Sequence, residues 1–341
     1  MSIDRDQYLK IRMNAGLFDA SHTFGRLFAR GKDAIDLLHR MSTNDMKPLE
    51  QGKNVATLTF LTNEKGRMID LMKAVRDGAG ETLLITSAGK EDAVIQWLDK
   101  FTIMEDAHFE RATEKTHQLL LCGPNATSII SQYTNQDLSE SRTQVHDLHF
   151  ESAPATLVKG PSVAGNGWFI LASAEHASVI WDQLVRDVIA CEGAIMDGEL
   201  FEVLRIENGT PITPNEINDK HNPLETPVAS VAVSFTKGCY IGQEVIARLD
   251  AQDKVQRKLV GLKFTEGVPQ VADRISMEAL TGTPLGDEIG DVTSVANSPV
   301  NGAIGLGYIR AKYANPGAVV SVKDSTGNKL PATLVQLPFN A

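Results

Sequence analysis

The stretch KGCYIGQEVIARL, residues Lys237–Leu249, places a cysteine among glycines just ahead of an apolar periodic pattern. Gly238 directly precedes Cys239 and Gly242 follows three residues later, so the backbone can take turn geometry that a Cβ would block. Only two other cysteines occur in the 341 residues. Cys239 is therefore the first candidate for a reactive group, and a small buried residue beside a tight turn is the alternative.

The sequence around Gly242 predicts a short helix that starts near Tyr240 or Ile241. Its apolar face is made by Val245, Ile246 and Leu249. Cys239 then lies at or just before the helix N-terminus, where unpaired backbone N–H groups and the helix dipole favour a thiolate. Lys237 adds a nearby cation. The pattern predicts a reactive centre formed by Cys239 and Lys237.

Length and composition restrict the classes of protein to consider. At about 100–200 residues per domain, 341 residues suit two or three domains, each with its own core. The chain has 33 basic and 43 acidic residues, a formal charge of −10. This balance disfavours nucleic acid and anionic lipid as direct partners.

The three cysteines, Cys122, Cys191 and Cys239, are widely spaced and include no CxxC pair. That spacing argues against a disulfide scaffold and a self-contained metal site. His146 and His149 in HDLH have no third ligand beside them, so we expect no stably bound metal. With no apolar secretory segment in residues 1–15 and no membrane-length apolar run, we expect a cytoplasmic protein in a reducing compartment.

The first 250 residues mix helical and strand patterns, which predicts an α+β region. Residues 82–86, TLLIT, have the composition of a strand. Three stripes of apolar residues have helical spacing and belong to the core rather than to a cofactor site. They are Ala34, Leu37, Leu38 and Met41; Val94, Trp97, Leu98 and Phe101; and Ile180, Leu184, Val185 and Val188.

Beyond Leu249 the pattern changes to a polar connector followed by short strands. The strand-like runs are residues 258–264, 303–309, 318–324 and 332–339, and DSTGNK at 324–329 suits a hairpin loop. We therefore expect residues 1–250 to form an α+β region of two interleaved subdomains, and residues 251–341 to form a small antiparallel β-barrel.

The octapeptide KGCYIGQE closely resembles the signature of the YgfZ family, a branch of the group around the aminomethyltransferase of the glycine cleavage system. Other stretches resemble that wider group over nearly the whole chain. They are GLFDASHTFGRLFARG (16–31), TND (43–45), TNEKGRMIDL (62–71), LRIENGTP (204–211), NPLE (222–225) and the run from EIGDVTS to AIGLGYIR (288–310).

This resemblance implies a multi-domain ring around a central folate channel, with a C-terminal antiparallel β-barrel. It implies tetrahydrofolate or a derivative as ligand, and iron–sulfur client or carrier proteins as partners, among them enzymes of tRNA modification. The expected function is support of iron–sulfur cluster assembly or repair through Cys239. A folate-dependent one-carbon transferase that moves an aminomethyl or methyl group is the alternative, because one fold can host many activities.

One motif departs from the transferase pattern. Related aminomethyltransferases carry Gly-Gly-x-x-Asp-Asp-Leu, whose second aspartate stabilises charge that develops on the folate nitrogens. Aligned on Gly66, the chain has Asp70 for the first aspartate and Leu71 for the second. The transferases' Gly-Glu-Asp-Gly-aromatic run is AGNGW at 164–168. The resemblance thus implies a retained folate fold without aminomethyltransferase chemistry.

A folate site needs a mostly apolar slot with a few converging polar groups. Arg205 and Arg67 are candidate cations for the glutamate tail, or else members of ordinary ion pairs. Glu207 either accepts from pterin N–H groups or pairs with Arg205. Asp70 is a pterin contact or a structural carboxylate.

The remaining candidates lie in the octapeptide. Tyr240 and Gln243 either line the slot or fix Cys239 and its helix. Cys122, after an apolar run, and Cys191, after a helical stripe, are expected to be inert. A cluster takes about four ligands, so Cys239 is expected to act together with a partner rather than to hold a cluster alone.

Overall fold

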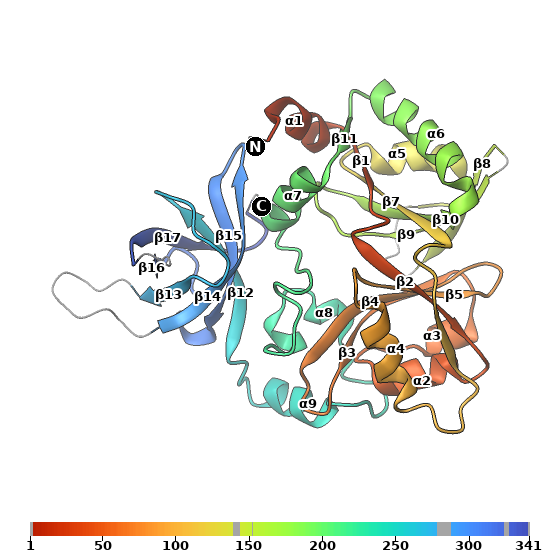
Figure 1. The fold of residues 1–341 in the computed structure, drawn as a ribbon, viewed down its shortest axis with the longest axis horizontal. Helices are drawn as coiled ribbons and strands as arrows, with labels where there is room; N and C mark the ends of the chain where they lie inside the picture. The colour runs from red at the N-terminus through yellow and green to blue at the C-terminus, as the bar shows by residue number, and fades with distance from the viewer. Residues whose placement is uncertain (1–2, 139–143, 152, 278–287, 324–326, 340–341) are drawn as a thin grey trace.

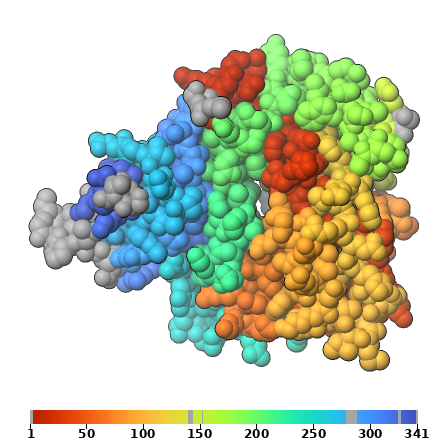
Figure 2. Space-filling model, viewed as in Figure 1, coloured from red at the N-terminus to blue at the C-terminus, as the bar shows by residue number. Residues whose placement is uncertain are grey.

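In the computed structural model, two β-sheets with their helices and a C-terminal barrel surround a central segment that carries α7 (Gly198–Asn208) and α8 (Ala229–Ala232) (Figure 1). The structure describes residues 3–138, 144–151, 153–277, 288–323 and 327–339. The barrel lies on one side of the molecule, and Figure 2 shows it projecting from the larger body formed by the two sheets.

The larger open sheet has the strand order β11-β1-β7-β10-β9-β8. Its strands are β1 (Gly16–Asp19), β7 (Thr116–Cys122), β8 (Val145–Phe150), β9 (Ala153–Lys159), β10 (Gly167–Ser173) and β11 (Ala194–Met196). The pairings are antiparallel except that of β1 with β11. Helices α5 (Ala126–Ile130) and α6 (Ala177–Ala190) pack on one face, where Leu119 and Leu121 share a buried cluster with Leu184.

The five-stranded sheet has the order β3-β4-β5-β2-β6. Its strands are β2 (Phe24–Arg30), β3 (Val55–Thr62), β4 (Met68–Arg76), β5 (Thr82–Ser87) and β6 (His108–Arg111). The helices α2 (Ala34–Met41), α3 (Lys47–Gln51) and α4 (Glu91–Asp99) cover one of its faces. The predicted strand at 82–86 and the three apolar helical stripes are confirmed, because the stripe residues are buried or partly buried in the clusters beneath these helices and α6.

The two sheets meet through their other faces. Val75 and Ile85 of the five-stranded sheet share one buried cluster with Leu120 and Leu171 of the larger sheet. At the same boundary, the ring of Phe24 lies edge-on to that of Phe169, with centroids 5.1 Å apart. The strands alternate between this shared core and a helix-covered face, so both faces of each sheet carry apolar residues.

The barrel closes in the order β12-β15-β14-β13-β16-β17. Its strands are β12 (Arg257–Phe264), β13 (Arg274–Met277), β14 (Glu288–Ser298), β15 (Gly302–Arg310), β16 (Val319–Lys323) and β17 (Lys329–Val335). All six pairings are antiparallel. Three of the four predicted strand regions are confirmed, whereas the run 332–339 is a strand only as far as Val335; β13 and β14 complete the barrel. β16 pairs with β17 as a hairpin whose loop residues 324–326 lie outside the described residues.

The remaining elements are helices and short turns of 3₁₀ helix. They are α1 (Arg5–Met13), α9 (Gln243–Ala251), η1 (Ser131–Tyr133), η2 (Ala174–His176), η3 (Pro223–Glu225) and η4 (Ala311–Tyr313). The Asp4 side chain accepts from the N–H groups of Asp6 and Gln7, so it caps α1. Because α9 extends to Ala251, the connector to the barrel is shorter than the sequence indicated.

The predicted fold class is confirmed: mixed helices and sheets are followed by a closed antiparallel barrel. Within the part of the chain that the structure describes, no helix is both long enough and apolar enough to span a bilayer.

Candidate functional site

The octapeptide KGCYIGQE forms an ordered loop in front of α9. The helix begins at Gln243, not near Tyr240 or Ile241, because Gly242 takes a left-handed backbone conformation with φ of +85°. Cys239 is exposed and lies three residues before Gly242. Cys239 was predicted at or just before the helix N-terminus; the helix begins later than expected, and the turn at Gly242 separates it from the cysteine.

Lys237 anchors this loop to the end of α2. Its ammonium donates to three backbone oxygens, those of His39, Ser42 (2.8 Å) and Asn44 (2.9 Å). Burial lowers the pKa of Lys237 to about 8, while the three carbonyl oxygens favour its charged form. A cation at the carboxyl end of a helix also complements the helix dipole. The Lys237 ammonium therefore binds backbone oxygens at the end of α2 and just beyond it. The sequence did not indicate this structural role.

The loop fits against the turn between β3 and β4. The hydroxyl of Thr62 donates to the Ile241 carbonyl at 2.8 Å, and the Ile241 N–H donates to the Arg40 carbonyl at 3.1 Å. A Cβ on Gly242 would lie 2.9 Å from the Cα of Gly66. These contacts fix the backbone at Ile241 and Gly242. They hold in place the loop that carries the Cys239 thiol.

Tyr240 fixes the loop from below. Its side chain is buried in an apolar cluster with Phe60 and Met68, and Leu71 packs against the same cluster. The ring lies beneath the Lys237 ammonium at 5.0 Å. Gln243, the first residue of α9, is half-buried. Of the two roles considered for Tyr240, holding the loop in place is the one that its contacts support.

Asp70 is a fully buried carboxylate in β4. It accepts from the Ser87 N–H at 2.9 Å, from the Ser87 hydroxyl at 2.5 Å and from the Thr213 hydroxyl at 3.4 Å. Burial raises its pKa to about 6, although the hydrogen bonds from Ser87 oppose the shift. Asp70 thus joins β4, β5 and the central segment at one point, and it can exchange a proton close to neutral pH.

Arg205 is a structural residue in α7. It is fully buried and pairs with Glu202 and with Glu216, the latter at 3.1 Å. Its guanidinium also donates to the Ser294 hydroxyl of β14 at 2.6 Å. Glu216 accepts from Thr293 and Ser294 as well. The ion-pair alternative for Arg205 is therefore the observed one, and the network joins the central segment to the barrel.

Glu207 forms a second buried connection to the barrel. Its carboxylate accepts from the Tyr8 hydroxyl at 2.9 Å and from the Ser298 hydroxyl, and Arg12 lies 3.7 Å away. Of the two roles considered for Glu207, pairing with Arg205 is not observed. The two residues are two positions apart on α7, and their side chains contact different parts of the barrel.

Arg67 is half-buried at the β3–β4 turn, where it donates to the Lys220 carbonyl at 2.6 Å. The guanidinium has five N–H donors, so this bond leaves capacity for an anion. The structure does not bring Arg205 or Glu207 to the octapeptide loop.

Several site residues had no signal in the sequence. Ser87 and Thr213 hold Asp70, and Glu216 forms the buried hub with Arg205. His221, hydrogen-bonded to Glu225 at 2.8 Å, stacks on Tyr308 of the barrel with centroids 3.5 Å apart. Only the NPLE run at 222–225, through its resemblance to the transferase group, pointed to this segment.

Comparison with known proteins identifies the family to which this fold belongs. Residues 2–237 match the GCVT N-terminal domain, and residues 257–340 match the glycine cleavage T-protein C-terminal barrel domain. The crystal structure of glycine cleavage system aminomethyltransferase T from Bartonella henselae superposes with a TM-score of 0.81 at 21% identity, covering 98% of this chain and 88% of that one. The shared fold is thus that of the aminomethyltransferases.

Curated relatives agree over nearly the full length. The chain is 31% identical to an aminomethyltransferase of Thermus thermophilus, covering 98% of this chain and 89% of the relative. It is 30% identical to a putative chloroplastic transferase of Arabidopsis thaliana, covering 95% and 71%. The fold is therefore that of an aminomethyltransferase-like protein. The chain belongs to the glycine cleavage T-protein family.

Proposed function

We propose that this protein is a tetrahydrofolate-dependent one-carbon transferase. The relatives are named for transfer of an aminomethyl group, and the chain spans about nine-tenths of several of them. The observation that carries the proposal is Asp70, which stands at the first aspartate of the family motif with a pKa near 6. A general acid or base works best when its pKa lies near the operating pH.

The residues around Asp70 suit a pterin in part. The Asp70 carboxylate and the hydroxyls of Ser87 and Thr213 form a compact polar group at the centre of the fold. Arg67 has donors to spare for an anionic tail, whereas Arg205 is fully engaged. Bound tetrahydrofolate would supply the nitrogens that carry the one-carbon unit. Asp70 would hold or release a proton at its carboxylate oxygens, and Arg67 would orient the ligand.

The transfer would differ from that of the aminomethyltransferases. Leu71, in place of the second aspartate, packs against the apolar cluster of Tyr240 and Met68. A leucine there can neither take a proton nor stabilise a cation. The proposal is therefore a folate-dependent transfer in which Asp70 is the carboxylate that this motif retains.

A binding titration followed by a turnover assay tests this proposal. The purified full-length chain is titrated with tetrahydrofolate and then incubated with tetrahydrofolate and candidate aminomethyl or methyl donors. We expect micromolar binding, turnover, and at least tenfold loss of turnover in Asp70→Asn. Asp250→Asn, which changes an exposed carboxylate of α9, is the control. Absence of binding up to millimolar ligand, or turnover unaffected by Asp70→Asn, would refute the proposal.

A second candidate is the accessory role in iron–sulfur cluster assembly or repair that the YgfZ resemblance suggested. The exposed thiol of Cys239 on its rigid loop favours it, and all three cysteines are free, which fits a reducing compartment such as the cytoplasm. Phe235, in the same segment, is 49% exposed. An accessible thiol and an exposed aromatic ring four residues apart in one segment suit contact with an iron–sulfur client or carrier protein, to which Cys239 would contribute one thiolate ligand.

Genetic complementation tests the second candidate. In a strain that lacks its own relative of this protein, we expect the wild-type chain and Cys191→Ser to restore the activity of iron–sulfur enzymes. Cys239→Ser should restore none. Full rescue by Cys239→Ser would remove the thiol from the function, while leaving the transferase proposal intact.

A further inference from the structure

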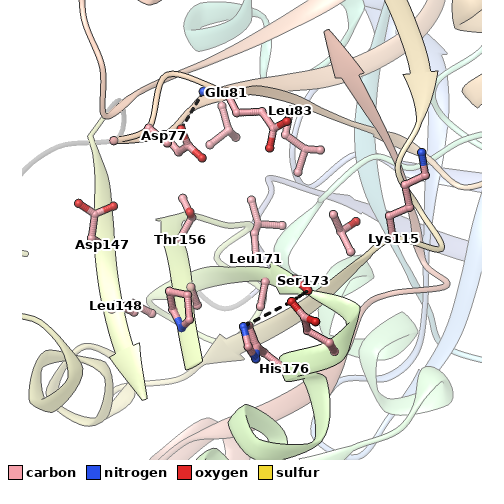
Figure 3. Close-up of a pocket in the computed structure, with 18 of the residues that line it drawn as sticks. Asp77, Glu81, Leu83, Lys115, Asp147, Leu148, Thr156, Leu171, Ser173 and His176 are labelled. Atoms are coloured by element: carbon pink, nitrogen blue, oxygen red, sulfur yellow. Dashed lines mark hydrogen bonds and ion pairs between the residues drawn. The ribbon is translucent and has the colours of Figure 1, made fainter. Parts of the chain in front are cut away.

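A cavity of about 520 Å³ lies between the two sheets, where the β4–β5 hairpin faces the edge of the larger sheet (Figure 3). This cavity is lined neither by Asp70 nor by any of the candidate residues in or around the octapeptide. Its walls are largely apolar. They include Phe28, Val75 and Leu83 from the five-stranded sheet and Leu148, Ala155 and Leu171 from the larger sheet. The volume lies in the range typical of small-molecule sites.

One end of the cavity is acidic. Asp77 at the end of the β4–β5 hairpin and Asp147 of β8 both project toward it (Figure 3). A Cβ on Gly78 would lie 3.1 and 3.2 Å from the two carboxylate oxygens of Asp147 and 3.2 Å from the Asn54 side-chain oxygen. These acceptors therefore converge on one small space, which the absence of a side chain at Gly78 keeps open.

Among the described residues, two of the acceptors at this end have no donor. The Asn54 side-chain oxygen is buried without a hydrogen-bond partner. Within the described residues, no hydrogen bond or ion pair reaches the carboxylate of Asp147, and that of Asp77 accepts only from the Glu81 N–H at 2.8 Å. A carboxylate and an amide oxygen that converge without a donor favour a cation between them.

The opposite end differs in charge. Lys115 and His176 lie there, with Glu175 3.7 Å from His176 (Figure 3). Lys115 is exposed, so this end opens toward solvent. The cavity therefore carries the carboxylates of Asp77 and Asp147 at one end and the Lys115 ammonium at its mouth.

We infer that this cavity binds a small amphipathic amine, a ligand with an apolar body and one protonated amino group. The amino group lies between Asp77 and Asp147 and donates to the Asn54 oxygen. The apolar body fills the space between Leu83 and Leu171. This site is separate from the central carboxylate Asp70 and does not depend on the proposed transferase activity.

Calorimetric titration of the full chain with three matched probes tests the inference. The probes are tryptamine, its neutral isostere tryptophol and the anionic indole-3-propionate. We expect tryptamine to bind at least tenfold more tightly than tryptophol, because only the ammonium compensates the two carboxylates. Indole-3-propionate should bind more weakly than either. Equal affinity for amine and alcohol would overturn the inference.

Three variants locate the site. Asp147→Asn should weaken tryptamine binding about tenfold and leave tryptophol binding unchanged. Thr156→Phe fills the cavity without changing its charge, because Thr156 lines the cavity and lies directly across from Leu171 in the sheet. It should abolish binding of both probes while the protein keeps its thermal transition. Asp250→Asn, on α9, should change neither affinity. Tryptamine binding that survives both Asp147→Asn and Thr156→Phe would place the amine elsewhere and refute the proposal.

Discussion

Gly66 and Gly242 face each other at a distance that admits no side chain on Gly242. Both take left-handed conformations, with φ of +64° and +85°, and a Cβ on Gly242 would lie 2.6 Å from the Asn63 carbonyl oxygen and 2.9 Å from the Gly66 Cα. The turn between β3 and β4 and the octapeptide loop therefore interlock through their backbones. This contact holds the segment that presents Cys239.

Replacing Gly242 by alanine should destabilise this contact strongly. The left-handed conformation alone costs a non-glycine residue about 1–2 kcal/mol, and overlap with backbone atoms adds about 1–3 kcal/mol. Gly317→Ala is the matched control, because Gly317 has φ of +86° and nothing within 4 Å of the added Cβ. Chemical denaturation should show a clearly larger loss of unfolding free energy for Gly242→Ala. Equal losses would mean that the interlock contributes nothing.

The buried pair of Arg205 and Glu216 should be a major contributor to the junction between α7 and the barrel. Both side chains are fully buried, so Arg205→Met leaves Glu216 charged without its partner, at a cost of about 3–5 kcal/mol. Arg274→Met breaks the exposed pair of Arg274 and Glu288 and should cost about 0–1 kcal/mol. Urea denaturation of the two variants measures the difference. A small cost for Arg205→Met would show that the ion pair contributes little to the junction, and Arg205 would again be a candidate to bind a ligand.

Much of the fold could be predicted because local patterns were strong. The stripe of Leu37, Leu38 and Met41 has helical spacing and therefore predicts α2. The run 258–264 has the pattern of a strand and therefore predicts β12. The start of α9 was missed because Gly242 interrupts the helical backbone, which an apolar period does not reveal. β14 has a register shift between Val292 and Ser294, which breaks the alternation that identifies a strand.

The candidate site was less predictable because its contacts join distant parts of the chain. Lys237 binds carbonyls of residues about 195 positions earlier, and Asp70 is held by Thr213. Sequence spacing shows which residues are close along the chain, whereas these partners become close only after the sheets and central segment pack. The charge of Lys237 was therefore assigned to Cys239, two residues away in the sequence, and neither alternative for Glu207 named Tyr8 or Ser298.

Asp70 should make stability depend on pH. Its pKa is near 6 in the folded protein and about 3.9 in an unfolded chain, so the folded state binds more protons between these values. Stability contributed by this group is present below about pH 4 and is lost as the pH rises toward 6, by about 3 kcal/mol in total. Relative to wild type, Asp70→Asn should therefore gain stability as the pH rises from 4 to 7.

Ser87→Ala sharpens this test. The Ser87 hydroxyl donates to the Asp70 carboxylate and favours its ionised form, so its removal should move the transition of the pH profile to higher pH. Unfolding free energies measured by denaturant titration at several pH values provide both profiles. Parallel curves for wild type and Asp70→Asn across this range would show that Asp70 does not titrate there.

The three thiols should differ sharply in their rate of alkylation. Cys239 is exposed, Cys191 is half-buried with its S–H directed to the Val188 carbonyl, and Cys122 is fully buried. Burial also raises the pKa of Cys122 to about 12, which suppresses its thiolate. A thiol-reactive dye should label Cys239 rapidly in the native protein, Cys191 more slowly and Cys122 only on unfolding. Cys239→Ser should remove the rapid phase, because the loop held by Lys237 and Gly242 exposes the Cys239 sulfur to solvent. Cys191→Ser should keep the rapid phase. A rapid phase that persists in Cys239→Ser would show that this loop does not expose its thiol in solution.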